Sequence, residues 1–182
     1  MLEYSREVLG TVCDRVVVAV PAGYEGHGPD RVVGGASRSE SVRLALETVP
    51  DATVAVVHDA ARPLVTAALV RACVDALDGL EGAVAAAPVS DTVKEVNGDR
   101  MVTRTLDRAS LWAIQTPQVF RADALRRAMD VDDAVLAAAT DDSSLVEAAG
   151  GAVRLVDAPR ENLKVTTALD LRVAEAILAG RC

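Results

Sequence analysis

Residues 53–63, TVAVVHDAARP, join a short apolar run to a polar motif. The run is nearly continuous in small and β-branched residues, which is typical of a strand that is covered on both faces of its sheet. Ligands of open α/β sheets bind beyond the carboxyl ends of the strands. Asp59 could therefore hold a sugar hydroxyl or sit near a metal ion, and Arg62 could bind a phosphate. The alternative is structural, with Asp59 capping the next turn and pairing with Arg62.

Similar apolar runs recur along the chain and alternate with amphipathic stretches. Further strands are predicted at residues 15–20, 83–89 and 153–156. Helices are predicted at residues 2–13, 66–77, 122–129, 142–149 and 167–179, and one more follows the capping box of residues 37–40. Gly180 is expected to end the last helix as a left-handed cap, and Asp141 and Asp142 to form an N-cap. Strands that alternate with helices favour an α/β fold with a doubly wound, mostly parallel sheet. Residues 1–182 show no internal repeat or linker, so a single domain is predicted.

Residues 91–107, DTVKEVNGDRMVTRTLD, are predicted to form a β-hairpin. Asn97-Gly98 favours a type I′ turn, and the flanking segments carry polar groups on both faces. A hairpin that buries neither face well is expected to project as an arm, and such arms often find their partner in a second subunit. A frayed surface hairpin is the alternative.

Composition narrows the partners and the compartment. The net charge is −8 and aromatic residues make up only 2% of the chain, so nucleic acid is not an expected partner. No apolar run approaches the roughly 18 residues that span a bilayer, and the opening MLEYSREVLG lacks the apolar core of an export signal. Three cysteines (Cys13, Cys73 and Cys182) lie far apart, which favours free thiols in a reducing cytoplasm.

Six short segments stand in a fixed order along the chain: GGASRSESV (34–42), HDAARP (58–63) after its buried strand, PVSDTVK (88–94), DRASLW (107–112) with QTPQVF (115–120), TDDSS (140–144) and ENLKVT (161–166). In this order they resemble the family of 2-C-methyl-D-erythritol 4-phosphate cytidylyltransferases. Any one segment is a weak signal, but the set in the family's order is specific. The resemblance runs from Met1 to about Gly180.

The resemblance implies a Rossmann-like nucleotidyltransferase fold and a reaction. CMP would pass from CTP to 2-C-methyl-D-erythritol 4-phosphate, with release of pyrophosphate, in non-mevalonate isoprenoid precursor biosynthesis. It also implies Mg²⁺ as cofactor, held mainly by the phosphates of CTP, with no residue of the chain assigned as a metal ligand. A homodimer would form through the arm, at about residues 88–116.

The resemblance further implies roles for individual residues. Arg108 and Lys164 would position the attacking phosphate as catalytic residues. The residues expected to contact the methylerythritol phosphate are Asp59, Arg62, Thr92 and Thr116. The nucleotide would be bound by Gly35, Ser41 and Asp59. Because Thr92 and Arg108 lie on the arm, they would serve the pocket of the partner subunit.

Each role has a purely structural alternative. Arg108 and Lys164 could be ordinary surface cations, Thr116 could cap the turn before Pro117, and Ser41 could be a plain first-turn serine. His58 ends an apolar strand, so a hydrogen-bonded structural histidine is favoured over a general base.

The family's Gly-rich phosphate loop, its central first strand and two basic residues at the reacting phosphorus precede everything in this sequence. Loss of transition-state contacts costs about a hundredfold or more per group, so the chain as written is expected to be inactive or weakly active. Exposed strand edges should also make it poorly stable alone. Two alternatives stay open: a cytidylyltransferase for another polyol phosphate such as ribitol 5-phosphate, and a non-catalytic dimeric remnant. A dinucleotide-binding oxidoreductase is disfavoured because no G-x-G-x-x-G follows a strand.

Overall fold

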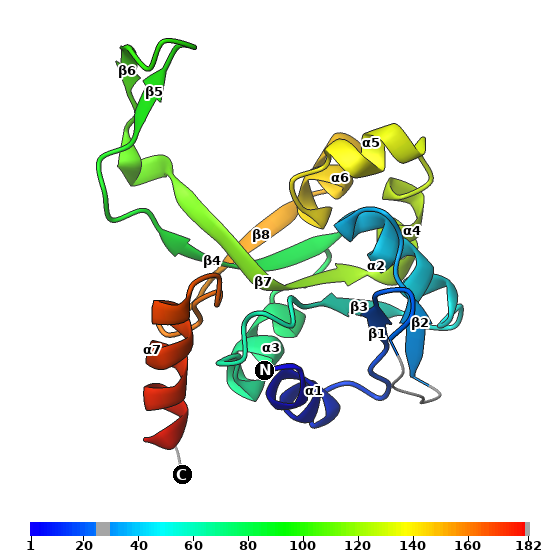
Figure 1. Cartoon of the computed structure of the whole chain (residues 1–182). Coiled ribbons are helices and arrows are strands. Elements are labelled where there is room, and N and C mark those ends of the chain that lie inside the picture. The colour runs from blue at the N-terminus through cyan, green and yellow to red at the C-terminus, as the bar shows by residue number, and fades with distance from the viewer. Residues whose placement is uncertain (25–29, 181–182) are drawn as a thin grey trace.

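The computed structural model describes residues 1–24 and 30–180, and its largest sheet is mixed (Figure 1). The strand order is β3-β7-β4-β8. The bounds are Val54–Val57 for β3, Trp112–Arg121 for β7, Gly82–Pro88 for β4 and Val153–Asp157 for β8. Strands β4 and β8 are parallel, whereas β7 lies between β3 and β4 and is antiparallel to both. The α/β class is confirmed. Strands β3, β4 and β8 run in one direction, as a mostly parallel sheet predicts, and β7 alone of the four runs against them, because the chain returns from the hairpin through the middle of the sheet.

A second, two-stranded sheet lies apart from the first. Strands β1 (Val18–Val20) and β2 (Arg31–Val33) pair in parallel, and neither is hydrogen-bonded to the larger sheet. The strand predicted over residues 15–20 is therefore confirmed only over its last three residues. One edge of β1 and one edge of β3 are left without a neighbouring strand in the described part of the chain.

Helices cover both faces of the larger sheet. Phe120 and Val84 point to the face covered by α2 (Arg38–Glu47), α4 (Ala122–Ala128), α5 (Asp133–Ala138) and α6 (Asp142–Ala148). Ala83, Ala85 and Val119 point to the other face. Helix α3 (Ala67–Asp75) packs on that face, and α1 (Leu2–Gly10) packs against α3. Every predicted helix is present, with ends that differ by up to three residues. The short α5 was not predicted.

The predicted hairpin is present as an arm that projects from the sheet (Figure 1). Within residues 1–24 and 30–180, strands β5 (Lys94–Val96) and β6 (Val102–Thr105) pair only with each other, and all their residues are exposed. The two-residue type I′ turn was wrong. The loop spans residues 97–101, Asn97 Oδ1 accepts the amides of Asp99 and Met101, and Arg100 takes the positive φ of 62°. The Asn97 side chain thus replaces the tight turn.

Two of the three predicted helix caps are present, and the third is not. Ser37 Oγ accepts the Glu40 amide at 3.1 Å as predicted, although the Glu40 carboxylate turns to the Ala36 amide. Asp141 caps α6 by accepting the Ser144 amide at 3.0 Å. The left-handed cap at Gly180 was wrong, since its φ is −82° and its amide closes a further right-handed turn onto Ala176.

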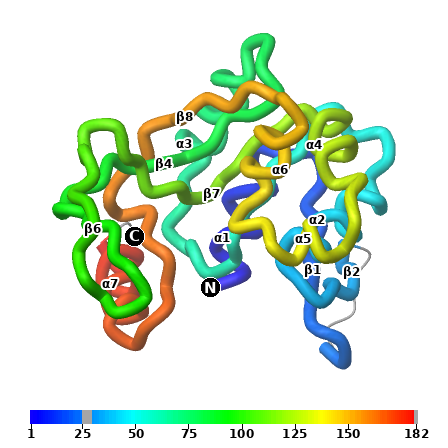
Figure 2. Tube along the Cα trace, turned by 90° about the horizontal axis from the view of Figure 1, so that it is seen from above, coloured from blue at the N-terminus to red at the C-terminus, as the bar shows by residue number. Residues whose placement is uncertain are grey.

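Helix α7 (Ala168–Ala179) stands apart from the rest, on the same side as the arm (Figure 2). Only Ala174 of its residues is buried, so packing contributes little to its stability. Its first turn is closed by a capping box between Thr167 and Asp170. Hydrogen bonds from the Thr166 backbone and side chain, and from Thr167, lower the pKa of Asp170 to about 2.

We expect Thr167→Ala to lower the local stability of α7 by about 1 kcal/mol, the usual effect of removing an N-cap hydroxyl. Amide hydrogen exchange of α7 should become faster, while exchange in α3 stays as it was. Thr103→Ala on the arm is the control, because its hydroxyl bonds only the Glu95 carbonyl. Unchanged exchange in α7 would contradict the dependence on this cap.

No helix in the described ranges is both long and apolar enough to cross a membrane. Cys13 and Cys73 carry free thiols, as predicted, and burial raises the pKa of Cys73 to about 12. Cys182 lies outside the described residues.

Candidate functional site

The site begins where β3 ends and the HDAARP turn starts. Thr116, which is buried on β7, accepts the Asp59 amide at 3.1 Å, and its hydroxyl lies 3.0 Å from His58 Nδ1. The other ring nitrogen of His58 is 3.1 Å from the Arg62 carbonyl. Burial lowers the pKa of His58. These contacts fix the turn to the sheet, and they agree with the structural interpretation of His58.

The Asp59 carboxylate lies between two cations. Its Oδ2 accepts from Lys164 Nζ at 2.9 Å and its Oδ1 from Arg38 Nε at 3.1 Å. Burial by itself raises the pKa of Asp59, but the Lys164 hydrogen bond and the Arg38 charge outweigh it, so the pKa lies below its ordinary value. The carboxylate is therefore held ionised and in a fixed orientation.

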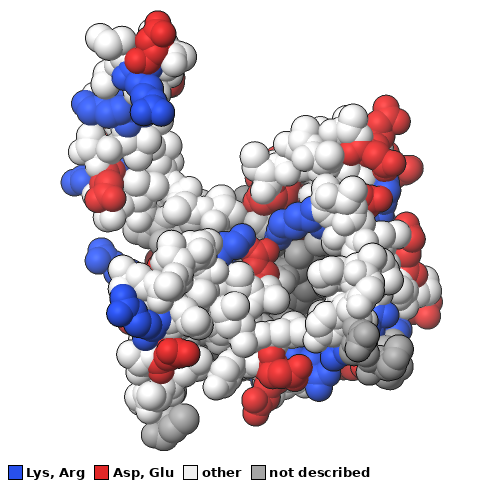
Figure 3. All heavy atoms as spheres, in the orientation of Figure 1, with Lys and Arg blue, Asp and Glu red and all other residues white. Residues whose placement is uncertain are grey.

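Arg38 continues this row of charges into the interior. Its Nη1 donates to Asp142 Oδ2 at 2.6 Å, and the Asp142 side chain has 0% exposure. Burial raises the pKa of Asp142, and the Arg38 charge opposes that effect. The alternating row Lys164–Asp59–Arg38–Asp142 ties the end of β3 to the first turns of α2 and α6. In Figure 3, basic and acidic side chains meet beside a hollow in the middle of this face.

Arg62 is turned toward the segment that carries Lys164. Its Nη1 donates to the Asn162 carbonyl at 2.7 Å, and burial lowers the pKa of its guanidinium. Its buried Nε has no hydrogen-bond partner among the described residues. The Asn162 side chain in turn donates to Gln115 Oε1 and to the Thr116 carbonyl. Arg62 is thus joined to Asp59 through the backbone, by the hydrogen bond from its amide to the Asp59 carbonyl, and to the Lys164 segment through its side chain.

Gly34 and Gly35 form a close loop over the start of α2. The Gly35 amide donates to Ser41 Oγ at 3.1 Å, and Ser41 Oγ donates to the Ser37 carbonyl at 2.8 Å. A Cβ on Gly35 would lie 2.3 Å from Glu40 Cγ, and one on Gly34 would lie 2.8 Å from Ser41 Oγ. A side chain at either position would have to displace Glu40 or Ser41 and so disturb the hydrogen bonds that these two residues make in the loop.

The two predicted arm residues are not brought to this cluster within one chain. Thr92 and Arg108 are exposed, and Arg108 Nη1 donates to the Ser90 carbonyl at 2.6 Å near the base of the arm. The structure therefore groups Asp59, Arg62, Thr116 and Lys164, and leaves Thr92 and Arg108 elsewhere.

The comparisons with known proteins agree with this architecture. The family described as IspD, 2-C-methyl-D-erythritol 4-phosphate cytidylyltransferase, matches residues 5–180. The chain belongs to this family. It is 48% identical over 163 residues to the cytidylyltransferase of Rubrobacter xylanophilus, covering 86% of this chain and 70% of that protein. It is 46% identical over 180 residues to that of Nocardia farcinica, covering 93% of this chain and 76% of that protein.

Solved structures of the family share the fold. The cytidylyltransferase from Thermus thermophilus superposes with a TM-score of 0.87 and 33% identity, over 98% of this chain and 88% of that one. The bifunctional IspDF of Campylobacter jejuni gives a TM-score of 0.78 and 28% identity, over 94% of this chain and 45% of that one. The family is one of nucleotidyltransferase enzymes, so the resemblance drawn from the sequence segments is confirmed.

Sequence reasoning missed Arg38, Asp142 and Asn162. Arg38 lies inside the segment that carried the resemblance, but an arginine in a first helical turn gives no signal by itself. Asp141 and Asp142 were both interpreted as an N-cap. Only Asp141 caps α6, and Asp142 instead pairs with Arg38 because a helix has a single N-cap position. The sequence carried one signal for this pair: Asp142 is a second acid beside the capping Asp141, and a single cap leaves it for another role.

Proposed function

We propose that this chain binds CTP and 2-C-methyl-D-erythritol 4-phosphate and transfers CMP to the second, releasing pyrophosphate, for isoprenoid precursor biosynthesis in the cytoplasm. Membership of the cytidylyltransferase family supports the reaction. The observation that carries the site is the row Lys164–Asp59–Arg38, which presents two cations and a fixed carboxylate at the carboxyl end of β3. Phosphorylated ligands bind at such strand ends in α/β sheets.

The reaction would require positioning rather than a covalent enzyme intermediate. An oxygen of the methylerythritol phosphate attacks the α-phosphorus of CTP, a new P–O bond forms, and the bond to the bridging oxygen of pyrophosphate breaks. Lys164 is half-exposed and can move its ammonium from Asp59 to the attacking phosphate. Asp59, Arg62 and Thr116 would hold the polyol, and the loop of Gly35 and Ser41 would contact the cytosine.

Mg²⁺ is the cofactor we propose, brought mainly by the CTP phosphates. The described residues contain no group of three His, Cys, Asp or Glu side chains that could hold a metal ion. Nucleotide-bound Mg²⁺ commonly takes only one or two protein carboxylates beside phosphates and water, and Asp59 fits that role. The ion would neutralise phosphate charge, while Lys164 and Arg62 orient the second substrate.

A direct comparison of polyol phosphates tests the proposal. The chain is incubated with CTP and MgCl₂ plus either 2-C-methyl-D-erythritol 4-phosphate or ribitol 5-phosphate, and pyrophosphate release and equilibrium binding are both measured. Binding is included because the sequence predicts weak turnover. We expect saturable binding of, and any turnover with, the methylerythritol ester. A preference for ribitol 5-phosphate would overturn the substrate, and nucleotide binding with no affinity for either polyol phosphate would favour the remnant.

The arm supports a homodimer in which each chain completes the pocket of its partner. It buries neither face within its own chain, and Arg108 and Thr92 are exposed on it. We expect Arg108→Ala and Lys164→Met each to weaken binding of 2-C-methyl-D-erythritol 4-phosphate in both pockets of their homodimers. Mixed dimers of the two variants should regain one pocket of full affinity, because one of their two pockets has both residues intact.

The same mixing separates this arrangement from a pocket built within one chain. If Arg108 served its own subunit, every pocket in the mixed dimer would carry one defect. No recovery after exchange of subunits, checked by native mass spectrometry, would contradict the shared pocket.

A further inference from the structure

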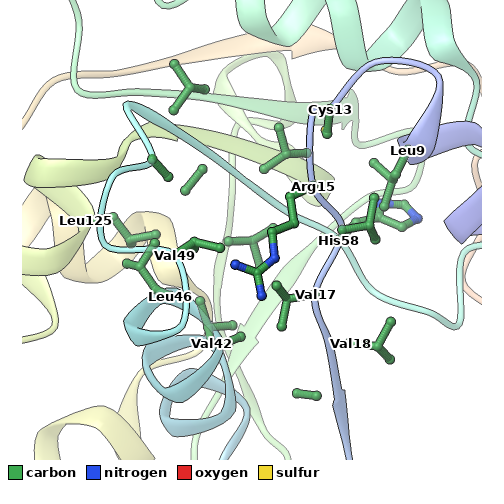
Figure 4. Close-up of a pocket in the computed structure, with 18 of the residues that line it drawn as sticks. Leu9, Cys13, Arg15, Val17, Val18, Val42, Leu46, Val49, His58 and Leu125 are labelled. Carbon is green, nitrogen blue, oxygen red and sulfur yellow. The ribbon is translucent and has the colours of Figure 1, made fainter. Parts of the chain in front are cut away.

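A groove of about 900 Å³ runs between β1 and β3, and Arg38 and Asp59 line it where β3 ends. Val42 and Leu46 follow Arg38 at successive turns of α2 and line the same groove (Figure 4). Their apolar side chains offer the guanidinium no acceptor. Arg38 instead finds its charge partners in Asp59 beside the groove and in Asp142 in the interior.

Asp142 is a buried ionisable group for which the proposed reaction gives no role. It begins α6, its side chain has 0% exposure, and its Oδ2 accepts from Arg38 Nη1 at 2.6 Å. Arg38 begins α2, where the positive end of the helix dipole disfavours a cation. The place of the guanidinium is therefore set by its carboxylate partners rather than by its own helix.

The two cations that share Asp59 are not equally free to leave it. Lys164 is 45% exposed, and exposed ion pairs contribute little, so its contact with Asp59 is easily exchanged. Arg38 is 35% exposed and also binds the buried Asp142. Its departure would leave that carboxylate without a counter-charge in the interior, which is strongly unfavourable. An arriving phosphate therefore meets one cation that it can draw away and one that it cannot.

The identity of the released cation matters for phosphate chemistry. A guanidinium binds two oxygens of a phosphate together, in a planar fork. An ammonium is a compact point charge on a flexible stem. The attacking phosphate has to turn one of its oxygens toward the α-phosphorus of CTP. An ammonium leaves the phosphate freer to make that turn than a fork does.

We propose that Asp142 is a positioning residue, which keeps Arg38 on Asp59 while Lys164 moves to the phosphate of 2-C-methyl-D-erythritol 4-phosphate. This role rests on the proposed function, because it decides which cation the ester receives. Asp142 acts through Arg38 and does not touch the substrate. Without the Asp142 charge, Arg38 becomes free to compete with Lys164 for the phosphate.

Asp142→Asn and Lys164→Met, alone and together, test this role by isothermal titration of the ester in the presence of CTP and MgCl₂. In the otherwise unaltered chain, Lys164→Met should weaken binding by roughly tenfold to a hundredfold. In the Asp142→Asn background the same substitution should cost about tenfold less, because the released Arg38 takes over part of the phosphate. If Asp142 were merely structural, Asp142→Asn would leave the Lys164 factor unchanged, and that result would overturn the role.

Asp133→Asn is the matched control. Asp133 also pairs with an arginine of α2, since its Oδ1 lies 2.8 Å from Arg43 Nη2, but its side chain is 78% exposed. The factor for Lys164→Met should be the same with Asp133→Asn as without it. An equal reduction of the factor in both aspartate backgrounds would assign the effect to net charge and overturn the role of Asp142.

Nuclear magnetic resonance of the unaltered chain tests the same role without a substitution in the interior. The chain has two lysines, so ¹³C-labelled lysine gives two Cε signals, and Lys94→Met assigns them. When the ester is added with CTP and MgCl₂, the Lys164 signal should shift. The Arg38 Nε–H, assigned with Arg38→Gln, should keep its slow exchange with water because its bond to Asp59 persists. Loss of that protection on binding of the ester would show that Arg38 is released and would contradict the role of Asp142.

The titrations separate this role from the proposed reaction. If Lys164→Met leaves affinity for the ester unchanged in the otherwise unaltered chain, the proposed phosphate site and the role of Asp142 are both wrong. If that loss is present but Asp142→Asn does not reduce it, the phosphate site stands and the positioning role alone is overturned.

Discussion

Arg38→Gln is expected to lower the free energy of unfolding by about 3 kcal/mol, because it leaves a buried carboxylate without its counter-charge. Asp142 has 0% side-chain exposure, and its Oδ2 lies 2.6 Å from Arg38 Nη1. Urea denaturation at neutral pH measures the loss. The burial that raises the pKa of Asp142 then acts unopposed, so the folded variant binds a proton more readily than the unfolded chain. The deficit should therefore be full at neutral pH and shrink as pH falls toward 3.8, the ordinary pKa of the carboxyl.

Arg43→Gln is the matched control on the same helix. Arg43 also crosses to an aspartate on another element, but that partner, Asp133, is 78% exposed, and exposed ion pairs contribute little. A second test is Asp142→Asn in the Arg38→Gln background, which removes the stranded charge and should recover much of the loss. Equal effects of the two arginine variants, or no recovery, would show that the buried pair is not what stabilises the junction of α2 and α6.

The central strand β7 shows why the sheet could be predicted only in part. Its sequence WAIQTPQVFR contains a proline and two glutamines, so neither alternation nor a continuous apolar run indicates a strand. The ladder with β4 shifts register between Val84 and Ala86, opposite the segment that holds Pro117, and proline is tolerated at such irregularities. Gln118 is buried because its amide reaches Asp141. Contacts with residues far away in the sequence therefore decide both the place of the proline in β7 and the burial of Gln118.

The strands β3 and β4 were predictable for the opposite reason. Their short runs of valine and alanine are bounded by turn residues, a pattern typical of strands that are covered on both faces of a sheet. Strand β1 was predicted too long, because Arg15, Val16 and Val17 lie beside the groove, where no neighbouring strand of the described residues extends the pairing.

The site, like the sheet, was predictable only where the signal is local in the sequence. Asp59 was identifiable from its place after a buried strand, which is a local signal. Its contact with Lys164 spans 105 residues, and the contact of Arg38 with Asp142 spans 104. No periodicity encodes such pairs. Lys164 entered through the resemblance of its segment to the family, whereas Arg38 was overlooked although it lies in a resembling segment, because its partner had been given a capping role.

Lys164→Met should weaken binding of 2-C-methyl-D-erythritol 4-phosphate by roughly tenfold to a hundredfold. Hydrogen bonds to charged groups contribute about 1.5–3 kcal/mol, and about 1.4 kcal/mol corresponds to a factor of ten. Methionine keeps the length of the side chain and removes its charge. Isothermal titration with the ester in the presence of CTP and MgCl₂ measures the change, and pyrophosphate release should fall at least as much.

Lys94→Met is the matched control, since Lys94 and Lys164 are the two lysines of the chain. Lys94 Nζ donates to Thr105 Oγ1 across the arm, away from the row of charges. Its replacement should leave affinity for the ester within the error of the titration. Equal losses in both variants would assign the effect to net charge rather than to the site.

Asp59→Asn separates the two roles open to Lys164. If the ammonium only orients Asp59, then removing the carboxylate charge makes the lysine dispensable, and Lys164→Met added to Asp59→Asn has no further effect on binding. If the ammonium binds the phosphate, Asp59→Asn frees it, and the lysine substitution still weakens the ester by a similar factor in that background. We expect the second result, because Lys164 is half-exposed while the Asp59 carboxylate keeps a second partner in Arg38. If the double variant binds the ester no more weakly than Asp59→Asn alone, Lys164 acts only by positioning Asp59.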